Sequence, residues 1–115
     1  MLSFTLRKEW FDKIKSGEKT IEYREVKPYW RQRMKKILPP CFYSNMKRII
    51  HTLKCEKLSV TYDKYDRPAC LLRKGYTNSC LIARIEKIEI VDGKNTDLHM
   101  NRPVYAFHLS TVKEK

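Results

Sequence analysis

The sequence predicts an α+β domain, in which a mixed sheet of five or six strands is combined with two or three helices. Apolar residues follow a helical period in several segments before residue 57, and they alternate with polar residues in most segments after it. The length of 115 residues suits one domain, residues 1–115, with a single hydrophobic core. Hydrophobic residues at 42% and charged residues at 33% are typical of a globular chain.

The N-terminal segment predicts a strand, a helix and a second strand. Residues 2–6 alternate between apolar and polar, which indicates a short strand. A helix is expected over residues 8–16, with a buried stripe of Trp10, Phe11 and Ile14. Gly17 suits the left-handed conformation that commonly ends a helix. Residues 19–25 return to a period of two, and the polar face of this strand consists of Thr20, Glu22 and Arg24.

Two further helices are expected in the next part of the chain. Pro28 suits the first turn of a helix over residues 28–38, because its missing N–H needs no partner there. The helix should end before Pro39, since a residue that precedes proline avoids the helical conformation. A third helix is predicted over residues 45–54, where Ser44 can cap it, on a stripe of Met46, Ile49, Ile50 and Leu53.

The second half of the chain predicts strands. Period-two patterns or apolar runs bounded by turn residues occur at 57–64, 68–75, 79–91 and 103–112. Gly75 ends the second of these strands. In the third, the apolar positions change phase between Ile85 and Ile88, which indicates a bulge or bend near residues 86–87. The segment "VDGKN", residues 91–95, is typical of a turn.

Positive charge is concentrated in the middle of the chain. The net charge is +12, and residues 27–57 contain nine basic residues and one acidic residue. A surface of this kind attracts polyanions, so we expect RNA, another single-stranded nucleic acid or a nucleotide as the partner. The basic surface predicted to contact the phosphate backbone consists of Arg31, Arg33, Lys35, Lys36, Lys47 and Arg48.

Other function classes are disfavoured by what the sequence does not contain. The four cysteines form no CxxC pair, so we expect no metal site, and no cofactor is indicated. No apolar run approaches the ~18 residues of a membrane span. The N-terminus does not have the layout of a secretion signal, so a cytoplasmic protein is expected. No obligate protein partner is evident.

Two motifs carry a resemblance to a known family. Gly17, Lys19, Glu22 and Arg24 form a G-x-K-x-x-E-x-R pattern directly after the first helix, and "RKGY" follows at residues 73–76. The chain thereby resembles the ASCH domain family of the PUA-like superfamily. The resemblance implies a small β-barrel in which the motif lines a cleft. It is weakest at residues 38–66, where this chain is expected to contain a helical insertion at about residues 38–57. It also implies binding of RNA or a nucleotide, and some relatives resemble hydrolases.

The motif residues differ in what they can do. Arg24 offers a planar fork of donors to a phosphate or carboxylate. Lys19, if desolvated, can act as a base or nucleophile. Glu22 and Arg24 share a strand face, so a purely structural ion pair between them is the alternative reading. Strict alternation would put Lys19 on the opposite face, and a shared cleft therefore requires Lys19 to lie in the loop before the strand.

Further ligand contacts are expected beside the motif. Aromatic rings can stack on bases, and the candidates for contact with single-stranded RNA or a nucleoside are Tyr23, Tyr29, Trp30 and Tyr76, of which Trp30 is also a candidate for the core and Tyr76 is favoured. Asn78 and Ser79 offer hydrogen bonds to a base edge. Arg73 can reach a phosphate. The predicted ligand-binding set is therefore Lys19, Glu22, Arg24, Tyr23, Arg73, Tyr76, Asn78 and Ser79.

The sequence leaves open whether the domain is an enzyme. In relatives that deacylate cytidines, a threonine occupies the position of Glu22 and supplies the reactive hydroxyl. The glutamate here disfavours that mechanism. The alternative function is a small hydrolase, either a modified-nucleoside amidohydrolase or a single-strand ribonuclease, with Lys19 and Glu22 as its catalytic acid and base. The ligand, the oligomeric state and the biological process are not encoded in any recognisable pattern.

Overall fold

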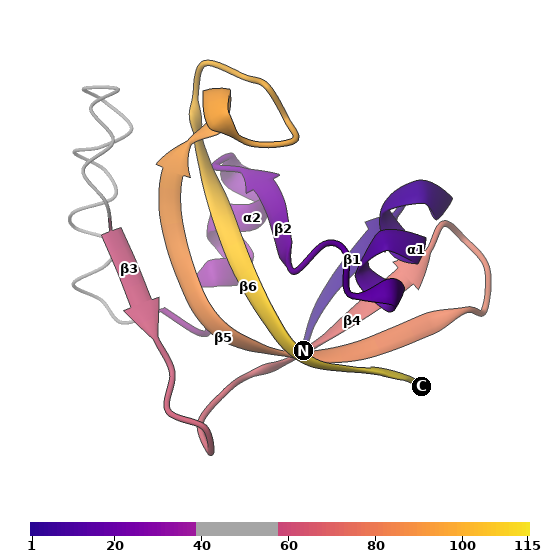
Figure 1. The fold of residues 1–115 in the computed structure, drawn as a ribbon. Helices are drawn as coiled ribbons and strands as arrows, with labels where there is room; N and C mark the ends of the chain where they lie inside the picture. Colours follow the sequence, from indigo (N-terminus) through magenta and orange to yellow (C-terminus); the bar gives the residue numbers. More distant parts are fainter. Residues whose placement is uncertain (39–57) are drawn as a thin grey trace. The chain divides into compact units, whose positions relative to one another are not determined.

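The computed structural model describes residues 1–38 and 58–115 (Figure 1). The helix predicted at 45–54, most of the predicted insertion, and the basic residues Lys47 and Arg48 lie outside the described residues. The helices are α1 (Lys8–Ser16), α2 (Pro28–Met34) and the short 3₁₀ helix η1 (Gly93–Asn95). The strands are β1 (Leu2–Leu6), β2 (Ile21–Glu25), β3 (Leu58–Thr61), β4 (Ala69–Lys74), β5 (Cys80–Asp92) and β6 (Pro103–Glu114).

The strands form a mixed sheet in the order β1-β4-β5-β6-β2, and β3 pairs with β5. The strands β1 and β4 are parallel, with Leu2 opposite Cys70 and Leu6 opposite Lys74. The pairs β4–β5 and β3–β5 are antiparallel. The predicted α+β class with a mixed sheet is confirmed, with six strands and two α-helices in the described ranges.

The chain divides into two compact units. The first unit consists of residues 1–22, 62–86 and 108–115, and the second of residues 23–61 and 87–107. The division falls within β5, between Glu86 and Lys87. At this point the buried positions of β5 change from Leu81, Ala83 and Ile85 to Ile88 and Ile90. The buried positions therefore change phase where the apolar positions of the sequence do, and the bulge or bend near residues 86–87 stays a prediction.

The core of the first unit forms where α1 packs on β4 (Figure 1). Phe11 and Ile14 on the inner face of α1 are buried, as the helical period predicts. The helix ends where Gly17 adopts a φ of 85° and donates its N–H to the Ile14 carbonyl at 3.1 Å. The buried apolar side chains of this unit also include Phe4, Leu6, Leu72, Leu81, Ile85 and Leu109.

The core of the second unit forms around aromatic residues. Trp30 and Met34 of α2 are buried, and the Trp30 ring centroid lies 6.3 Å from that of Phe107. Phe107 in turn lies 6.0 Å from Tyr105. α2 is shorter than predicted, because after Met34 the chain continues in turns, in which the Leu38 N–H donates to the Met34 carbonyl at 3.0 Å. Among the described residues, no helix is long and apolar enough to cross a membrane.

Gly93 in the β5–β6 connection has no room for a side chain. A Cβ there would lie 2.6 Å from the Met100 carbonyl oxygen and 2.7 Å from that of Arg102. Both neighbouring oxygens belong to the backbone, and the Gly93 N–H donates a hydrogen bond to the Arg102 carbonyl at 2.8 Å. Moving either oxygen away therefore requires a shift of the backbone. We expect Gly93→Ala to lower the free energy of unfolding by about 1–3 kcal/mol. Urea denaturation measures this change in the free energy of unfolding. The control is Asn95→Ala, at an exposed position of the same 3₁₀ helix. Equal stability of the two variants would contradict the prediction.

Candidate functional site

Lys19 and Glu22 form an ion pair that is nearly closed to solvent. Lys19 Nζ lies 3.6 Å from Glu22 Oε1, and the two side chains are 11% and 6% exposed. Lys19 precedes the first residue of β2, and its N–H donates to the Lys13 carbonyl at 3.0 Å. The neighbouring Thr20 carbonyl accepts from Leu109 at 2.9 Å. The loop position that the shared-face argument requires for Lys19 is thus the one observed.

Trp10 extends this site. The Lys19 ammonium lies 4.6 Å from the centroid of the Trp10 ring, and the Lys13 ammonium lies 5.1 Å from it. The sequence places Trp10 in the buried stripe of α1, but this side chain is only half-buried. Trp10 is therefore part of the candidate site, a role that the helical period alone does not indicate.

In β2, the polar side chain of Glu22 is more buried than the apolar and aromatic side chains on either side of it. Glu22 is 5% exposed, whereas Ile21 and Tyr23 are half-buried. Burying a carboxylate is costly unless an opposite charge and hydrogen bonds compensate, and Lys19 provides the opposite charge. A buried Lys–Glu pair of this kind either stabilises one local structure or holds groups in place for a ligand.

Cys70 on β4 is the titratable neighbour of this pair. Burial raises the pKa of the Cys70 thiol to about 12, and the negative charge of Glu22 contributes to the increase. Because the thiol stays protonated near neutral pH, Cys70 is not a nucleophile in this site.

We expect the two described cysteines to differ sharply in reactivity. Cys70 is fully buried and its thiol pKa is raised to about 12, so its thiol is almost entirely protonated at pH 8.5. Cys80 is half-buried. In a variant with Cys41→Ser and Cys55→Ser, iodoacetamide at pH 8.5 should modify Cys80 and leave Cys70 unmodified until urea unfolds the protein. Mass spectrometry identifies the modified cysteines. Rapid modification of Cys70 in the folded protein would contradict the conclusion that burial raises the pKa of its thiol.

Arg24 and Tyr23 belong to the second unit. The guanidinium carbon of Arg24 lies 5.4 Å from the centroid of the Trp30 ring. Burial raises the pKa of Tyr23, and the negative charges of Asp97 and Glu89 add to the shift. Tyr23 therefore keeps its hydroxyl proton and remains a potential hydrogen-bond donor.

The predicted Arg-x-Gly-Tyr segment forms the end of the β4–β5 hairpin. Gly75 adopts a φ of 55°, and its N–H donates to the Leu6 carbonyl at 2.7 Å. Thr77 Oγ1 donates to the Lys74 carbonyl at 2.6 Å and accepts from the Ser79 N–H at 3.3 Å. This turn leaves Tyr76 97% exposed. The side chains of Arg73, Asn78 and Ser79 are also exposed.

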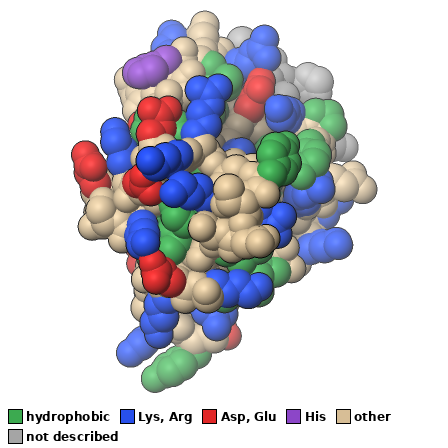
Figure 2. Space-filling model, turned by 90° about the vertical axis from the view of Figure 1, so that its right-hand side faces the viewer, with side chains coloured by type: hydrophobic (Ala, Val, Ile, Leu, Met, Phe, Trp, Pro, Cys, Tyr) green, Lys and Arg blue, Asp and Glu red, His purple; other side chains and the backbone are tan. Residues whose placement is uncertain are grey.

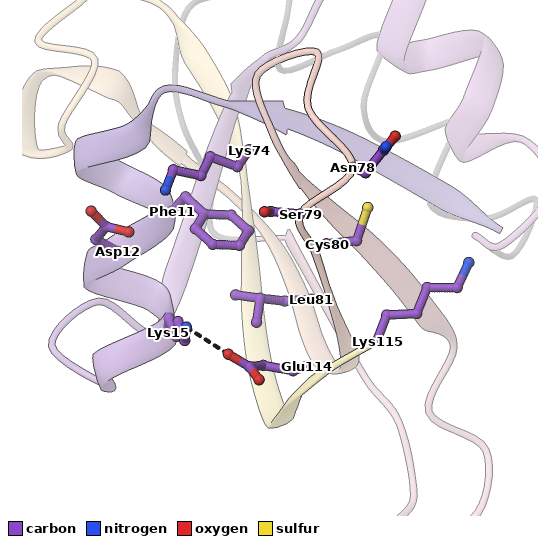
Figure 3. Close-up of a pocket in the computed structure, with 10 residues that line it drawn as sticks. All are labelled: Phe11, Asp12, Lys15, Lys74, Asn78, Ser79, Cys80, Leu81, Glu114 and Lys115. Carbon is purple, nitrogen blue, oxygen red and sulfur yellow. Dashed lines mark ion pairs between the residues drawn. The ribbon is translucent and has the colours of Figure 1, made fainter.

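A pocket of about 340 Å³ lies between α1, the β4–β5 hairpin and the end of β6 (Figure 3). Asn78 and Ser79 belong to its lining, and the sequence-based set also predicts these two residues. Its other polar lining residues are Asp12, Lys15, Lys74, Glu114 and Lys115, of which only Lys74 belongs to a segment that the sequence singles out, "RKGY". Lys19 and Glu22 are not part of the lining, so this pocket is distinct from the buried pair.

One wall of the pocket is closed by an exposed ion pair. Lys15 Nζ lies 2.5 Å from Glu114 Oε1 (Figure 3). The hydrogen bond from Lys15 and its positive charge lower the pKa of Glu114, and the reciprocal contact raises the pKa of Lys15. The pairing is present above the ordinary carboxyl pKa and is lost as the pH falls through the lowered value.

Four of the six basic residues that the sequence assigns to a phosphate-contacting surface lie on α2 and the turn after it, and the other two, Lys47 and Arg48, lie outside the described residues. Arg33, Lys35 and Lys36 are exposed and Arg31 is half-buried. Over the face drawn in Figure 2, Lys and Arg side chains are distributed widely rather than gathered in one patch, and Asp or Glu side chains lie beside several of them. The segment 26–38 differs from this pattern, because it contains five basic residues and no acidic one.

Two features of the site were therefore accessible from the sequence and one was not. The structure brings Lys19 and Glu22 together, and it presents Tyr76 at the end of a hairpin. It also brings the Trp10 ring to 4.6 Å from Lys19 Nζ, and it brings Cys70 within the electrostatic influence of Glu22. Local patterns could not reveal either neighbour, because Trp10 lies on α1 and Cys70 lies on β4, 48 positions after Glu22. Comparison with known proteins adds no relative: no protein-family model, no curated protein and no solved structure matches this chain.

Proposed function

We propose that this chain is an RNA- or nucleotide-binding domain of the ASCH type, with the barrel architecture of the PUA-like superfamily. The single observation that supports the proposal is the basic segment 26–38, which contains five basic residues and no acidic one. Its cations are Lys27, Arg31, Arg33, Lys35 and Lys36, and all but the half-buried Arg31 are exposed. A local concentration of cations attracts phosphates and releases counterions on binding.

The motif residues fit a role in ligand contact within the same proposal. Lys19 is held by Glu22 at 3.6 Å and by the Trp10 ring at 4.6 Å, so its ammonium group is fixed before a ligand arrives. A fixed donor loses little conformational entropy on binding. Tyr76, at 97% exposed, offers a free aromatic face that can stack on a base.

Binding of a fluorescent single-stranded RNA tests the proposal. Fluorescence anisotropy at about 50 mM salt should show saturable binding that is weaker for a duplex of the same length. A poly-glutamate chain of similar charge serves as the control for unspecific attraction. No binding of the RNA at low salt, or equal binding of both polymers, would overturn the proposal.

A second candidate function is favoured by the geometry of the buried pair. Lys19 Nζ and Glu22 Oε1 lie 3.6 Å apart in a place nearly closed to water, which is an arrangement that general acid–base catalysis uses. With water as the nucleophile, such a pair can cleave an amide of a modified nucleoside. With a 2′-hydroxyl as the nucleophile, it can cleave a phosphodiester of single-stranded RNA. The protonated Cys70 thiol makes a cysteine nucleophile unsuitable.

Lys19→Ala separates the two functions, and Lys13→Ala is the matched control, since its ammonium contacts the same Trp10 ring. If turnover of an acylated-nucleoside and RNA panel is detected, is lost in Lys19→Ala and is retained in Lys13→Ala, the domain is a hydrolase. If no turnover occurs but RNA binding weakens in Lys19→Ala, the binding function holds. Thermal melting of both variants, together with Lys19→Arg, distinguishes these results from unfolding.

A further inference from the structure

Tyr29 on α2 is an exposed aromatic residue that carries a stacked cation. Its side chain is 53% exposed, and the guanidinium carbon of Arg33 lies 3.5 Å from the ring centroid. Arg33 also donates from Nη1 to the Tyr29 carbonyl at 3.1 Å. Because the two residues are four positions apart on one helix, they lie on the same face. Arg33 is therefore held at both its π face and its N–H edge.

The ring of Tyr29 rests on a rigid base. Its centroid lies 5.2 Å from that of Trp30, with the planes 77° apart, which is the favourable edge-to-face arrangement. Trp30 is 5% exposed and packs against Phe107 in the core of the second unit. The Tyr29 ring is thus held in place by its contacts with Trp30, which is part of the core, and with Arg33. A fixed aromatic surface binds a planar partner with little loss of conformational entropy.

The charges around this stack favour an anionic partner. The segment 26–38 contains five basic residues and no acidic one, and Lys27, Lys35 and Lys36 are exposed. A planar group joined to a negative charge by a short linker would match both the aromatic ring of Tyr29 and the positive charges around it. Nucleotides have this chemistry, with a base that stacks and a phosphate that pairs with cations.

We propose that the Tyr29–Arg33 stack is a platform for an unpaired base of single-stranded RNA, whose flanking phosphates are bound by the cations of α2 and the turn after it. This inference rests on the proposed nucleic-acid binding and names the residues that read the base. It assigns to Tyr29 a role different from that of the backbone contacts, because stacking requires an unpaired base whereas phosphate contacts do not. Duplex RNA, whose bases are stacked on each other, gains nothing from the platform.

The test compares Tyr29→Ala with Tyr29→Trp and Arg33→Lys on a single-stranded RNA labelled with 2-aminopurine. Tyr29→Ala should weaken binding about 5- to 150-fold, whereas Tyr29→Trp should bind as tightly as the wild type or more tightly. Arg33→Lys keeps the charge and removes the planar guanidinium, so it should weaken binding with no change in salt dependence. Quenching of 2-aminopurine should be lost in Tyr29→Ala alone.

The control variant is Tyr65→Ala, since Tyr65 is 93% exposed and lies in the first unit. It should bind RNA like the wild type. Equal affinities of Tyr29→Ala and the wild type, with wild-type salt dependence retained, would overturn the platform while leaving the proposed function intact. Absence of RNA binding by the wild type would overturn both. Weaker binding of Tyr29→Ala to an acidic peptide, but not to RNA, would assign the surface to a protein partner instead.

Discussion

Glu22→Ala is expected to lower the free energy of unfolding by about 3–5 kcal/mol, because it leaves the ammonium group of Lys19 without its buried counter-charge. The two side chains are 6% and 11% exposed, so water can replace the lost carboxylate only after the local structure opens. Urea denaturation of the wild type and the variant measures the difference.

Two controls show whether the charge is the cause. The double variant Lys19→Met, Glu22→Leu removes both charges and keeps similar volumes, so it should regain most of the lost stability. Glu114→Ala breaks an ion pair on the surface, where water solvates both partners, and should leave the unfolding free energy unchanged within error. If Glu22→Ala is as stable as Glu114→Ala, the ion pair does not hold this part of the structure together.

Neutralising the cations of α2 and its following turn should have the largest effect on binding. The variant Arg31→Gln, Arg33→Gln, Lys35→Gln, Lys36→Gln removes four of the five positive charges in residues 26–38. Each phosphate contact contributes a salt slope of about −0.7 with single strands, which corresponds to about a fivefold change in affinity at 0.1 M salt. We therefore expect affinity for single-stranded RNA to fall by two to three orders of magnitude.

A charge-matched control separates position from net charge. Lys8, Lys64, Lys94 and Lys113 are all exposed and lie outside the segment 26–38. Replacing these four lysines by glutamine lowers the net charge by the same amount. Affinity in this control should fall by less than tenfold, as measured by anisotropy at 0.1 M salt. Equal losses in the two variants would show that the total charge, rather than the α2 segment, determines binding.

The elements of the fold could be predicted because their periodicities are local. The stripe of Phe11 and Ile14 predicts α1, and the alternation in residues 2–6 predicts β1. The phase change after Ile85 predicts the change in the buried positions of β5, where the structure divides into its two units. The length of α2 could not be predicted, because the turns after Met34 keep apolar Ile37 and Leu38 at spacings that a continued helix would also give.

The site was only partly predictable, for a different reason. Lys19 and Glu22 are three residues apart, and they meet because Lys19 lies in the loop before β2, the position that a shared cleft requires. The influence of the Glu22 charge on Cys70, and the pocket between α1, the hairpin and β6, depend on the packing of elements far apart in the chain. The register of parallel strands such as β1 and β4, which places Leu2 opposite Cys70, is likewise a long-range feature. No short-range pattern specifies such a register.

The dependence of RNA affinity on salt tests the central claim most directly. The logarithm of the association constant for a single-stranded RNA should be measured by anisotropy between about 50 mM and 400 mM salt. With four to five phosphate contacts on the segment 26–38, the slope against the logarithm of the salt concentration should be about −3. A slope indistinguishable from zero, or no detectable binding at the lowest salt concentration, would contradict the account.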